Sequence, residues 1–186
     1  RMPLLTVLVL SFAGSTWSQT SWPEGNVRLV VPYAPGGTTD FAARQIAQKL
    51  TEQTGKSFFV ENKAGASGTI GTDMVAKSKP DGATFQVNDT TYAMLPHLFK
   101  KLPWDHATDL IPVTTLAVTP LVVVVGANAP YKTAQEFIEF ARRHPGKANY
   151  GSGGVGSSTH LGAELLKQSG KLFITHIPTK ARVTPF

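Results

Sequence analysis

The chain has 186 residues, which is the size of one domain, or of one domain and part of another. It contains no cysteine, which excludes disulfides, iron–sulfur clusters, thiolate zinc sites and a cysteine nucleophile. Its formal net charge is +6, but the basic residues are scattered, and no aromatic residues alternate with the doublets Lys100-Lys101 and Arg142-Arg143. Nucleic acid is therefore a poorly supported partner.

The N-terminal residues 3–14 form an apolar run that is too short to span a bilayer but has the length of the apolar region of a signal peptide. A site with the small residues Ser15, Thr16 and Ser18 follows. We expect residues 1–18 to be an export signal that is cut near Ser18. A buried N-terminal strand is the alternative.

The stretch from Val27 to Leu50 predicts a strand, a tight turn and a helix. Its apolar residues from Leu29 to Val31 are typical of a strand buried in a parallel sheet. An apolar stripe with helical spacing follows the turn and consists of Ala43, Ile46, Ala47 and Leu50. The predicted helix ends at Thr54-Gly55. The predicted N-cap region holds Thr38, Thr39 and Asp40.

The turn itself contains Gly36 and Gly37, which would let a ligand approach main-chain N–H groups at a helix N-terminus that favours anions. The alternative is that the glycines only turn the chain. Asp40 has three interpretations: it complements the helix dipole, it binds a ligand amine, or it orients the Gly36-Gly37 turn from behind.

The same order of strand, glycine turn and helix then repeats. Strands are predicted at 57–61 and 84–88, with a short helix carrying Ile70, Met74 and Val75 between them and another short helix within 88–104. This order favours an α/β sheet with crossover connections. Two apolar runs at 111–118 and 121–125 are predicted to be extended strands, and the break between them is the expected boundary between two lobes.

In the second half, a capping box at 133–136 predicts a helix that stops at 144–146. A short strand at 148–150 then leads into a glycine-rich turn, a helix to Gly170 and a last strand at 173–177. Gly151, Gly153 and Gly156 match the dinucleotide-binding pattern, but no acidic residue occurs after Glu164 to bind a ribose. What remains is a group of backbone donors and hydroxyls at a helix N-terminus, which suits a carboxylate or a phosphate.

A serine hydrolase built on Ser157 or Ser158 is weakly supported. Ser158 and His160 are two residues apart at the start of a helix, where their side chains do not face each other, and no Gly-x-Ser-x-Gly elbow is present. We expect His160 to form hydrogen bonds or to pack in the wall of a cleft. The five histidines lack the spacing of a metal site.

Five ordered segments together resemble one family. They are residues 27–40, 60–73, 79–82, 96–105 and 149–161. They resemble the Bug family, also called the TctC type, which are periplasmic solute-binding receptors of tripartite tricarboxylate transporters. The resemblance runs from about Trp22 to Pro178.

The resemblance implies an α/β protein with the two-lobed, hinge-closing architecture of periplasmic binding proteins, in which the second lobe is incomplete in this chain. It implies a first lobe at 22–118, a second, partial lobe at 119–178 and a divergent tail at 179–186. It also implies transport rather than catalysis, with no cofactor and no metal. The implied partners are membrane transporter subunits and a small organic acid: a dicarboxylate, a tricarboxylate, an aromatic acid or an acidic amino acid.

In that family the ligand carboxylate lies against main-chain groups and ordered water from one turn of each lobe. By position, the implied ligand-binding residues here are Tyr33, Ala34, Pro35, Gly36, Gly37, Thr38, Thr39, Asp40, Asn88, Thr90, Ser152, Gly153, Gly154, Ser157, Ser158, Thr159 and His160.

The sequence departs from the family pattern in two places. Asp89 puts a carboxylate near the expected anion site, which favours a zwitterionic ligand unless the side chain points away. After Pro178 the usual Tyr-Lys-Gly is replaced by an unrelated tail, and the chain is shorter than other members. The chain therefore resembles a truncated or frameshifted copy, for which we expect weak binding or none. A hydrolase or a dinucleotide enzyme that uses the turn at 151–160, and a nonfunctional fragment, remain as alternatives.

Overall fold

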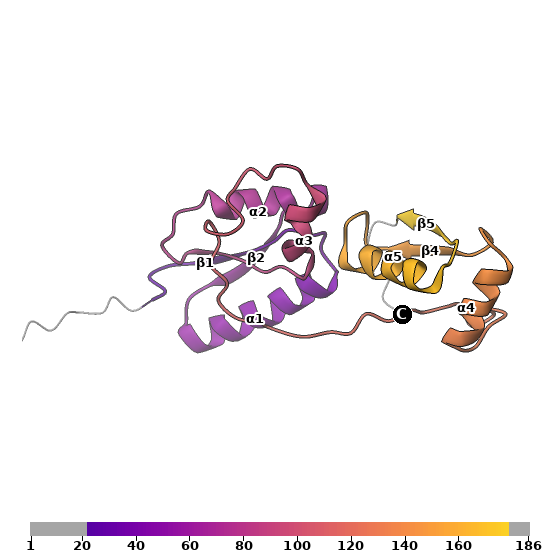
Figure 1. Cartoon of the computed structure of the whole chain (residues 1–186). Helices are drawn as coiled ribbons and strands as arrows, with labels where there is room; N and C mark the ends of the chain where they lie inside the picture. The colour runs from indigo at the N-terminus through magenta and orange to yellow at the C-terminus, as the bar shows by residue number, and fades with distance from the viewer. Residues whose placement is uncertain (1–21, 179–186) are drawn as a thin grey trace, which may run out of the picture.

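The computed structural model of the chain describes residues 22–178, which form two α/β lobes joined by a long connection at residues 99–133 (Figure 1). The first lobe contains the elements β1 to α3, and the second contains α4 to β5. The expected export signal and the divergent tail lie outside the described residues. No helix within 22–178 is long and apolar enough to cross a bilayer.

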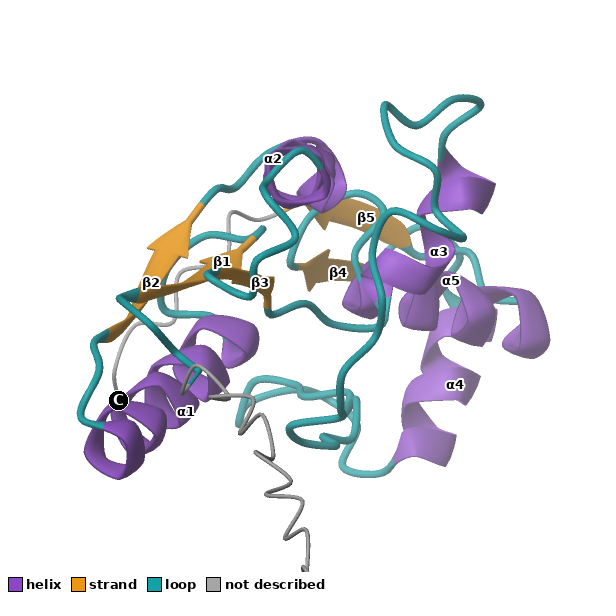
Figure 2. Cartoon of the chain, turned by 90° about the vertical axis from the view of Figure 1, so that its left-hand side faces the viewer, coloured by secondary structure: helices purple, strands orange, loops and turns teal. Residues whose placement is uncertain are grey.

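The first lobe is built on a three-stranded parallel sheet in the order β2-β1-β3. Its elements are β1 (Val27–Val31), α1 (Thr38–Thr54), β2 (Phe58–Asn62), the 3₁₀ turn η1 (Ala66–Gly68), α2 (Thr69–Ala76), β3 (Thr84–Gln86) and α3 (Thr91–Leu98). The expected strands and helices of this half are therefore confirmed, with ends that move by one or two residues. Figure 2 shows α1 on one side of this sheet and α2 on the other.

The central strand β1 is buried because it has a strand on each side and a helix on each face. Val30 and Val31 have no exposed surface, and Leu29 is only 4% exposed. The core of this lobe joins β1 to Ala43 and Ala47 of α1, which belong to the predicted apolar stripe. The helix then ends at Gly55, whose φ of 68° is easily adopted only by glycine.

The second lobe is smaller. It comprises α4 (Ala134–Arg143), β4 (Asn149–Ser152), α5 (Ser158–Gly170) and β5 (Thr175–Pro178), and its two strands pair in parallel. Its core is made by Ala141, Ala148, Leu172 and Ile174. The predicted capping of α4 is confirmed, since Thr133 Oγ1 accepts the Glu136 N–H, while the Glu136 carboxylate accepts the N–H of Lys132, one residue before the N-cap.

The prediction of strands at 111–118 and 121–125 is wrong for this structure, which has no strand between α3 and α4 in the described part of the chain. Ile111, Val118 and Val124 are 84%, 89% and 82% exposed. The reason is that apolar, β-branched residues make a strand only where a neighbouring strand pairs with the backbone, and here no neighbour is provided. The expected lobe boundary falls inside this connection and stays a prediction.

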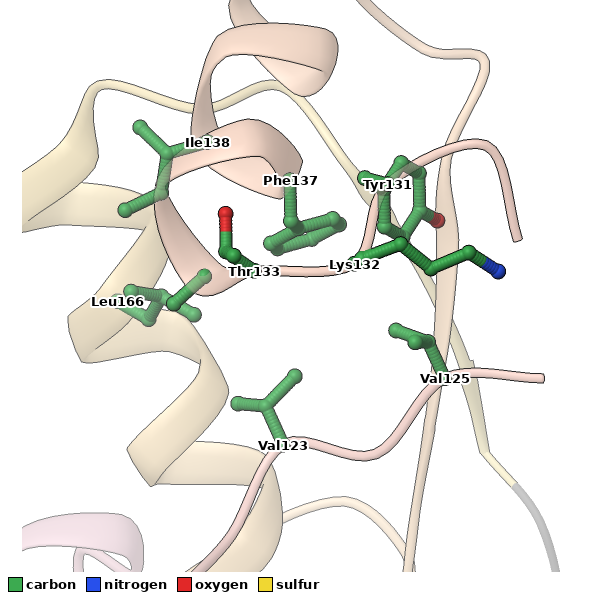
Figure 3. A pocket seen from close by; sticks show the side chains of 9 residues that line it. Val123, Val125, Tyr131, Lys132, Thr133, Phe137, Ile138 and Leu166 are labelled. Carbon is green, nitrogen blue, oxygen red and sulfur yellow. The ribbon is translucent and has the colours of Figure 1, made fainter. Parts of the chain in front are cut away.

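The end of the connection returns to the second lobe and closes an apolar pocket of about 200 Å³ (Figure 3). Val123 and Val125 form one side of the pocket. Tyr131 and Phe137 lie on the opposite side, and Leu166 of α5 lies at one end.

Candidate functional site

The first turn leads from β1 into α1, and it leaves the N-terminus of the helix open. The helix begins at Thr38 after Gly37, whose backbone is extended, and no side chain caps it. The first bond of the helix is donated by Phe41 N–H to the Gly37 carbonyl. The N–H groups of the residues before Phe41 have no carbonyl within the helix to bond. The structure thus places Thr38 and Thr39 inside the first turn of the helix, which corrects the prediction that they belong to the cap.

The Asp40 side chain, in the first turn of α1, holds the turn that precedes the helix. Its carboxylate accepts hydrogen bonds from Gly36 N–H at 2.9 Å, from Asn62 Nδ2 at 2.9 Å and from Arg44 Nε at 3.0 Å. Burial alone would raise the pKa of Asp40, but these donors outweigh it and hold the pKa below its usual value. Of the three interpretations of Asp40, its contacts support orientation of the turn.

A second polar link holds the start of the turn to α3. Tyr33 donates its hydroxyl proton to Asp89 Oδ1 at 2.9 Å, and the same oxygen accepts the N–H of Thr91 at 2.8 Å. Burial, followed by the Asp89 charge, raises the pKa of Tyr33 far above its usual value. The unusual Asp89 thus has partners within its own lobe, while Asn88 and Thr90 on either side of it are exposed.

The second turn, between β4 and α5, is closed by its own side chains. Gly153 N–H donates to Thr159 Oγ1 at 3.0 Å, and Gly154 N–H donates to Ser152 Oγ at 3.2 Å. Ser157 is the N-cap of α5 and accepts the His160 N–H at 3.2 Å. This helix N-terminus is therefore capped, in contrast to that of α1. Both turns were expected to receive the ligand carboxylate in the same way, and they differ in this respect.

The lobes meet at the second turn. Ser67 Oγ donates to the Val155 carbonyl at 2.9 Å, and Ser158 N–H donates to Thr91 Oγ1 at 3.2 Å. These hydrogen bonds join the turn to η1 and to the start of α3. Ala34 and Pro35, at the tip of the first turn, are exposed.

Sequence reasoning missed Ser67 and Thr91 as site residues. Ser67 lies in the left-handed region with φ 55°, and next to it Gly68 passes so close to Tyr33 that a Cβ there would lie 3.2 Å from Cε1 of the tyrosine ring. The two glycines of the loop at 62–69 were a usable sign of a tight turn. No feature of the sequence indicated that the loop reaches the other lobe.

The hydrolase interpretation gains nothing from these side chains. The Ser157 hydroxyl donates its hydrogen bond to the Gly154 carbonyl rather than to a histidine. His160 Nδ1 already accepts a hydrogen bond from the Gly156 N–H. Ser152 Oγ does lie 2.7 Å from His176 Nε2, but within residues 22–178 no carboxylate bonds to that imidazole as a triad would require. In the same range, no cluster of three metal-ligating side chains occurs.

Two α/β lobes that meet where the turn between β4 and α5 contacts η1 and the start of α3 have the architecture of a two-lobed solute-binding protein. The receptor family of the tripartite tricarboxylate transporters, TctC, matches residues 42–184 of the chain. The chain belongs to this family, as the resemblance of its segments indicated.

Curated relatives agree with this assignment. A UPF0065 protein of Bordetella pertussis is 37% identical over 176 residues, which are 94% of this chain and 54% of the relative. Protein BugT of the same organism is 33% identical over 165 residues, covering 88% of this chain and 51% of the relative. The chain thus spans about half the length of the curated relatives it matches.

Solved structures confirm the two-lobed fold. A structure described as a periplasmic transporter has 38% identity and a TM-score of 0.78, with 87% of this chain and 54% of that chain covered. MatC from Rhodopseudomonas palustris with bound malate has 32% identity and a TM-score of 0.75, and the match covers 86% of this chain and 55% of MatC. R. palustris Rpa4515 with adipate has 35% identity and a TM-score of 0.72, covering 86% and 54%.

Proposed function

We propose that this chain is a periplasmic receptor, or part of one, that captures a small carboxylate-bearing metabolite for a tripartite tricarboxylate-type transporter. The observation that carries the proposal is the open N-terminus of α1, at a turn that Asp40 holds in place. A helix N-terminus with unbonded N–H groups attracts an anion through those groups and through the helix dipole.

The surroundings of this helix end suit an anionic ligand. The Asp40 carboxylate would repel a ligand carboxylate, but it faces Arg44 and two other donors. Its charge is therefore compensated by these three donors. The exposed residues 34–36 and the exposed Thr38 leave the helix end accessible.

The ligand class is inferred from the family and from two of the solved neighbours. Adipate and malate, named in those structures, are both dicarboxylates. We therefore propose a dicarboxylate or a related organic acid. We further propose that the protein acts by binding alone, with the periplasm and the membrane subunits of the transporter as its setting.

The expected affinity is low for this chain by itself. A charge-assisted hydrogen bond contributes about 1.5–3 kcal/mol, and micromolar binding requires about −8 kcal/mol. Two or three such bonds from one helix end cannot reach that value once the entropy of association is subtracted. Both lobes would have to contribute, and this chain spans about half the length of its relatives. We expect a dissociation constant well above the micromolar range.

Thr38 offers a clean test, because the first position of a helix tolerates proline and the extended backbone of Gly37 suits the residue before a proline. Thr38→Pro removes one N–H from the helix end, whereas Thr38→Ala keeps it and serves as the matched control. We expect Thr38→Pro to weaken binding of malate or adipate about 10- to 150-fold, the equivalent of one charge-assisted bond, and Thr38→Ala to change it little.

Binding is measured by NMR titration of the ¹⁵N-labelled chain up to millimolar ligand, which detects weak complexes. Equal affinities of the two variants would show that this helix end does not hold the carboxylate. Absence of binding by the unmodified chain would contradict the receptor function for this chain. Turnover of ester or amide substrates that Ser158→Ala abolishes would favour the hydrolase alternative.

A further inference from the structure

Two histidines are stacked beneath the second turn. The rings of His160 on α5 and His176 on β5 have centroids 4.2 Å apart and planes 28° apart. Tyr150 on β4 stacks beside both rings, with its centroid 4.8 Å from that of His176 and 6.5 Å from that of His160. The side chain of His160 is only 17% exposed. Both histidines are therefore partly buried, and their rings pack against each other within the second lobe.

Each histidine is tied to the turn by a hydrogen bond. The Gly156 N–H donates to His160 Nδ1 at 3.1 Å. His176 Nε2 lies 2.7 Å from Ser152 Oγ, and Ser152 Oγ accepts the Gly154 N–H. A backbone N–H can donate only to an unprotonated ring nitrogen, so the bond to Gly156 requires a neutral His160 with its proton on Nε2.

Gly156 lies where the turn touches the other lobe. A Cβ at this position would lie 2.9 Å from Ser67 Oγ and 3.2 Å from Leu98 Cδ1, both in the first lobe. The residue before it, Val155, accepts the hydrogen bond of Ser67. Whatever fixes Gly156 therefore also fixes this part of the contact between the lobes.

The groups around His160 decide how easily it gains a proton. His176 faces it from β5 and Tyr150 from β4, while Glu164 and Lys167 face it from α5. Burial and then the neighbouring His176 lower the pKa of His160, and Glu164 opposes them. The effect of Glu164 is limited, because its Oε1 is 3.9 Å from Nε2 and already accepts hydrogen bonds from Lys167 and Tyr150.

We propose that His160 is a positioning residue that holds the second turn in its ligand-receiving shape through the Gly156 N–H, and that protonation of Nδ1 releases the turn and lowers the affinity for carboxylates. The proposal rests on the proposed receptor function. It assigns to His160 a role beneath the turn, in place of the direct ligand contact that the family resemblance implies.

The first experiment needs no ligand. The imidazole resonances and the Gly156 amide resonance of the ¹⁵N-labelled chain are followed by NMR from pH 8 to pH 4.5. We expect the Gly156 amide to shift with the same midpoint as His160, below the ordinary pKa of histidine of about 6.5. A Gly156 amide that ignores the titration of His160 would overturn the proposal, whether or not any ligand binds.

The second experiment compares variants. Asn Oδ1 occupies the place of Nδ1 and accepts a hydrogen bond without titrating, whereas Phe cannot accept one. Malate binding is measured at several pH values for the unmodified chain, His160→Asn and His160→Phe. His144→Asn, an exposed histidine at the end of α4, is the control.

We expect the affinity of the unmodified chain to fall up to about tenfold per pH unit below the pKa of His160, since one proton is taken up on release. His160→Phe should bind malate more weakly at all pH values. His160→Asn should recover part of that lost affinity but should not show the steep fall with pH. His144→Asn should show the same steep fall as the unmodified chain. Titration of malate itself affects all four proteins equally and cancels in their ratios.

The outcomes separate the two proposals. Equal pH profiles for the unmodified chain and His160→Asn would refute the positioning role while leaving carboxylate binding intact. If malate and adipate fail to bind at any pH, the receptor function fails, and the NMR titration of Gly156 alone still decides whether His160 holds the turn.

Discussion

The carboxylate of Asp40 accepts the backbone N–H of Gly36 at 2.9 Å, so a side chain inside α1 fixes the turn that precedes this helix. Two more donors, Arg44 and Asn62, hold the same carboxylate, and Asp40 itself is 3% exposed. The geometry of the turn thus depends on one buried acid, and this dependence can be measured.

Asp40→Ala should destabilise the chain by about 2–4 kcal/mol, because it removes the acceptor of the Gly36 N–H and of one hydrogen bond each from Asn62 and Arg44. Urea unfolding followed by circular dichroism measures the change. Glu52→Ala on the same helix is the matched control, since Glu52 is exposed and its contacts with Lys49 and Gln48 are local. Equal losses for the two variants would mean that the buried network adds no stability.

The same network predicts a dependence on pH. The pKa of Asp40 is lower in the folded chain than its ordinary value of 3.8. The stabilisation is therefore present above pH 3.8 and is lost as the pH falls through the folded-state pKa. Asp40→Asn should lose less stability than the unmodified chain between pH 5 and pH 2.5.

Local patterns predicted much of the first lobe. The β-branched strand, the stripe from Ala43 to Leu50 and the terminal Gly55 all act within a few residues, and the structure agrees with each of them. Ile111 to Val125 carried an equally strong strand signal, but a strand depends on a partner that local sequence does not specify. The prediction of strands at 111–118 and 121–125 failed for that reason.

The candidate site also has some features that local sequence predicted and others that it did not. The two glycine turns were predicted from the sequence because glycine and helix-start residues mark them. The link from Ser67 to Val155 spans 88 positions, and the bond from Gly156 to His160 depends on which ring nitrogen faces the turn. Pairings of this kind arise from tertiary packing and leave no periodic signal.

Gly156 and Gly154 test the contact between the lobes. Both have positive φ, 79° and 119°, so alanine should cost about 1–2 kcal/mol at either position. Only at Gly156 does the added Cβ meet the first lobe, while a Cβ at Gly154 has open space. Gly156→Ala should therefore also expand the chain, as measured by small-angle X-ray scattering, and Gly154→Ala should not. Identical scattering would show that the lobes do not depend on this contact.

Thr91 joins the lobes from α3 and is 1% exposed. Thr91→Val keeps the shape of the side chain but leaves the Ser158 N–H without its acceptor, which we expect to cost about 1–3 kcal/mol. Hydrogen exchange of the Ser158 amide should speed up by about tenfold or more, corresponding to at least about 1.4 kcal/mol. Thr90→Val, at the exposed neighbouring position, is the control and should leave that rate unchanged.

The apolar connection carries the last prediction. No charged residue lies between Asp109 and Lys132, and Val124 is 82% exposed within a β-branched run. Exposed segments that are apolar, β-prone and uncharged pair with copies of themselves, and a charge within them opposes this. Val124→Lys should therefore reduce light scattering of the concentrated chain, while its free energy of unfolding changes by less than about 0.5 kcal/mol. Thr108→Lys adds the same charge at an exposed position outside the run and separates the effect of position from that of net charge. If both lysines suppress scattering equally, self-association does not arise from this run, because only Val124→Lys places a charge within it.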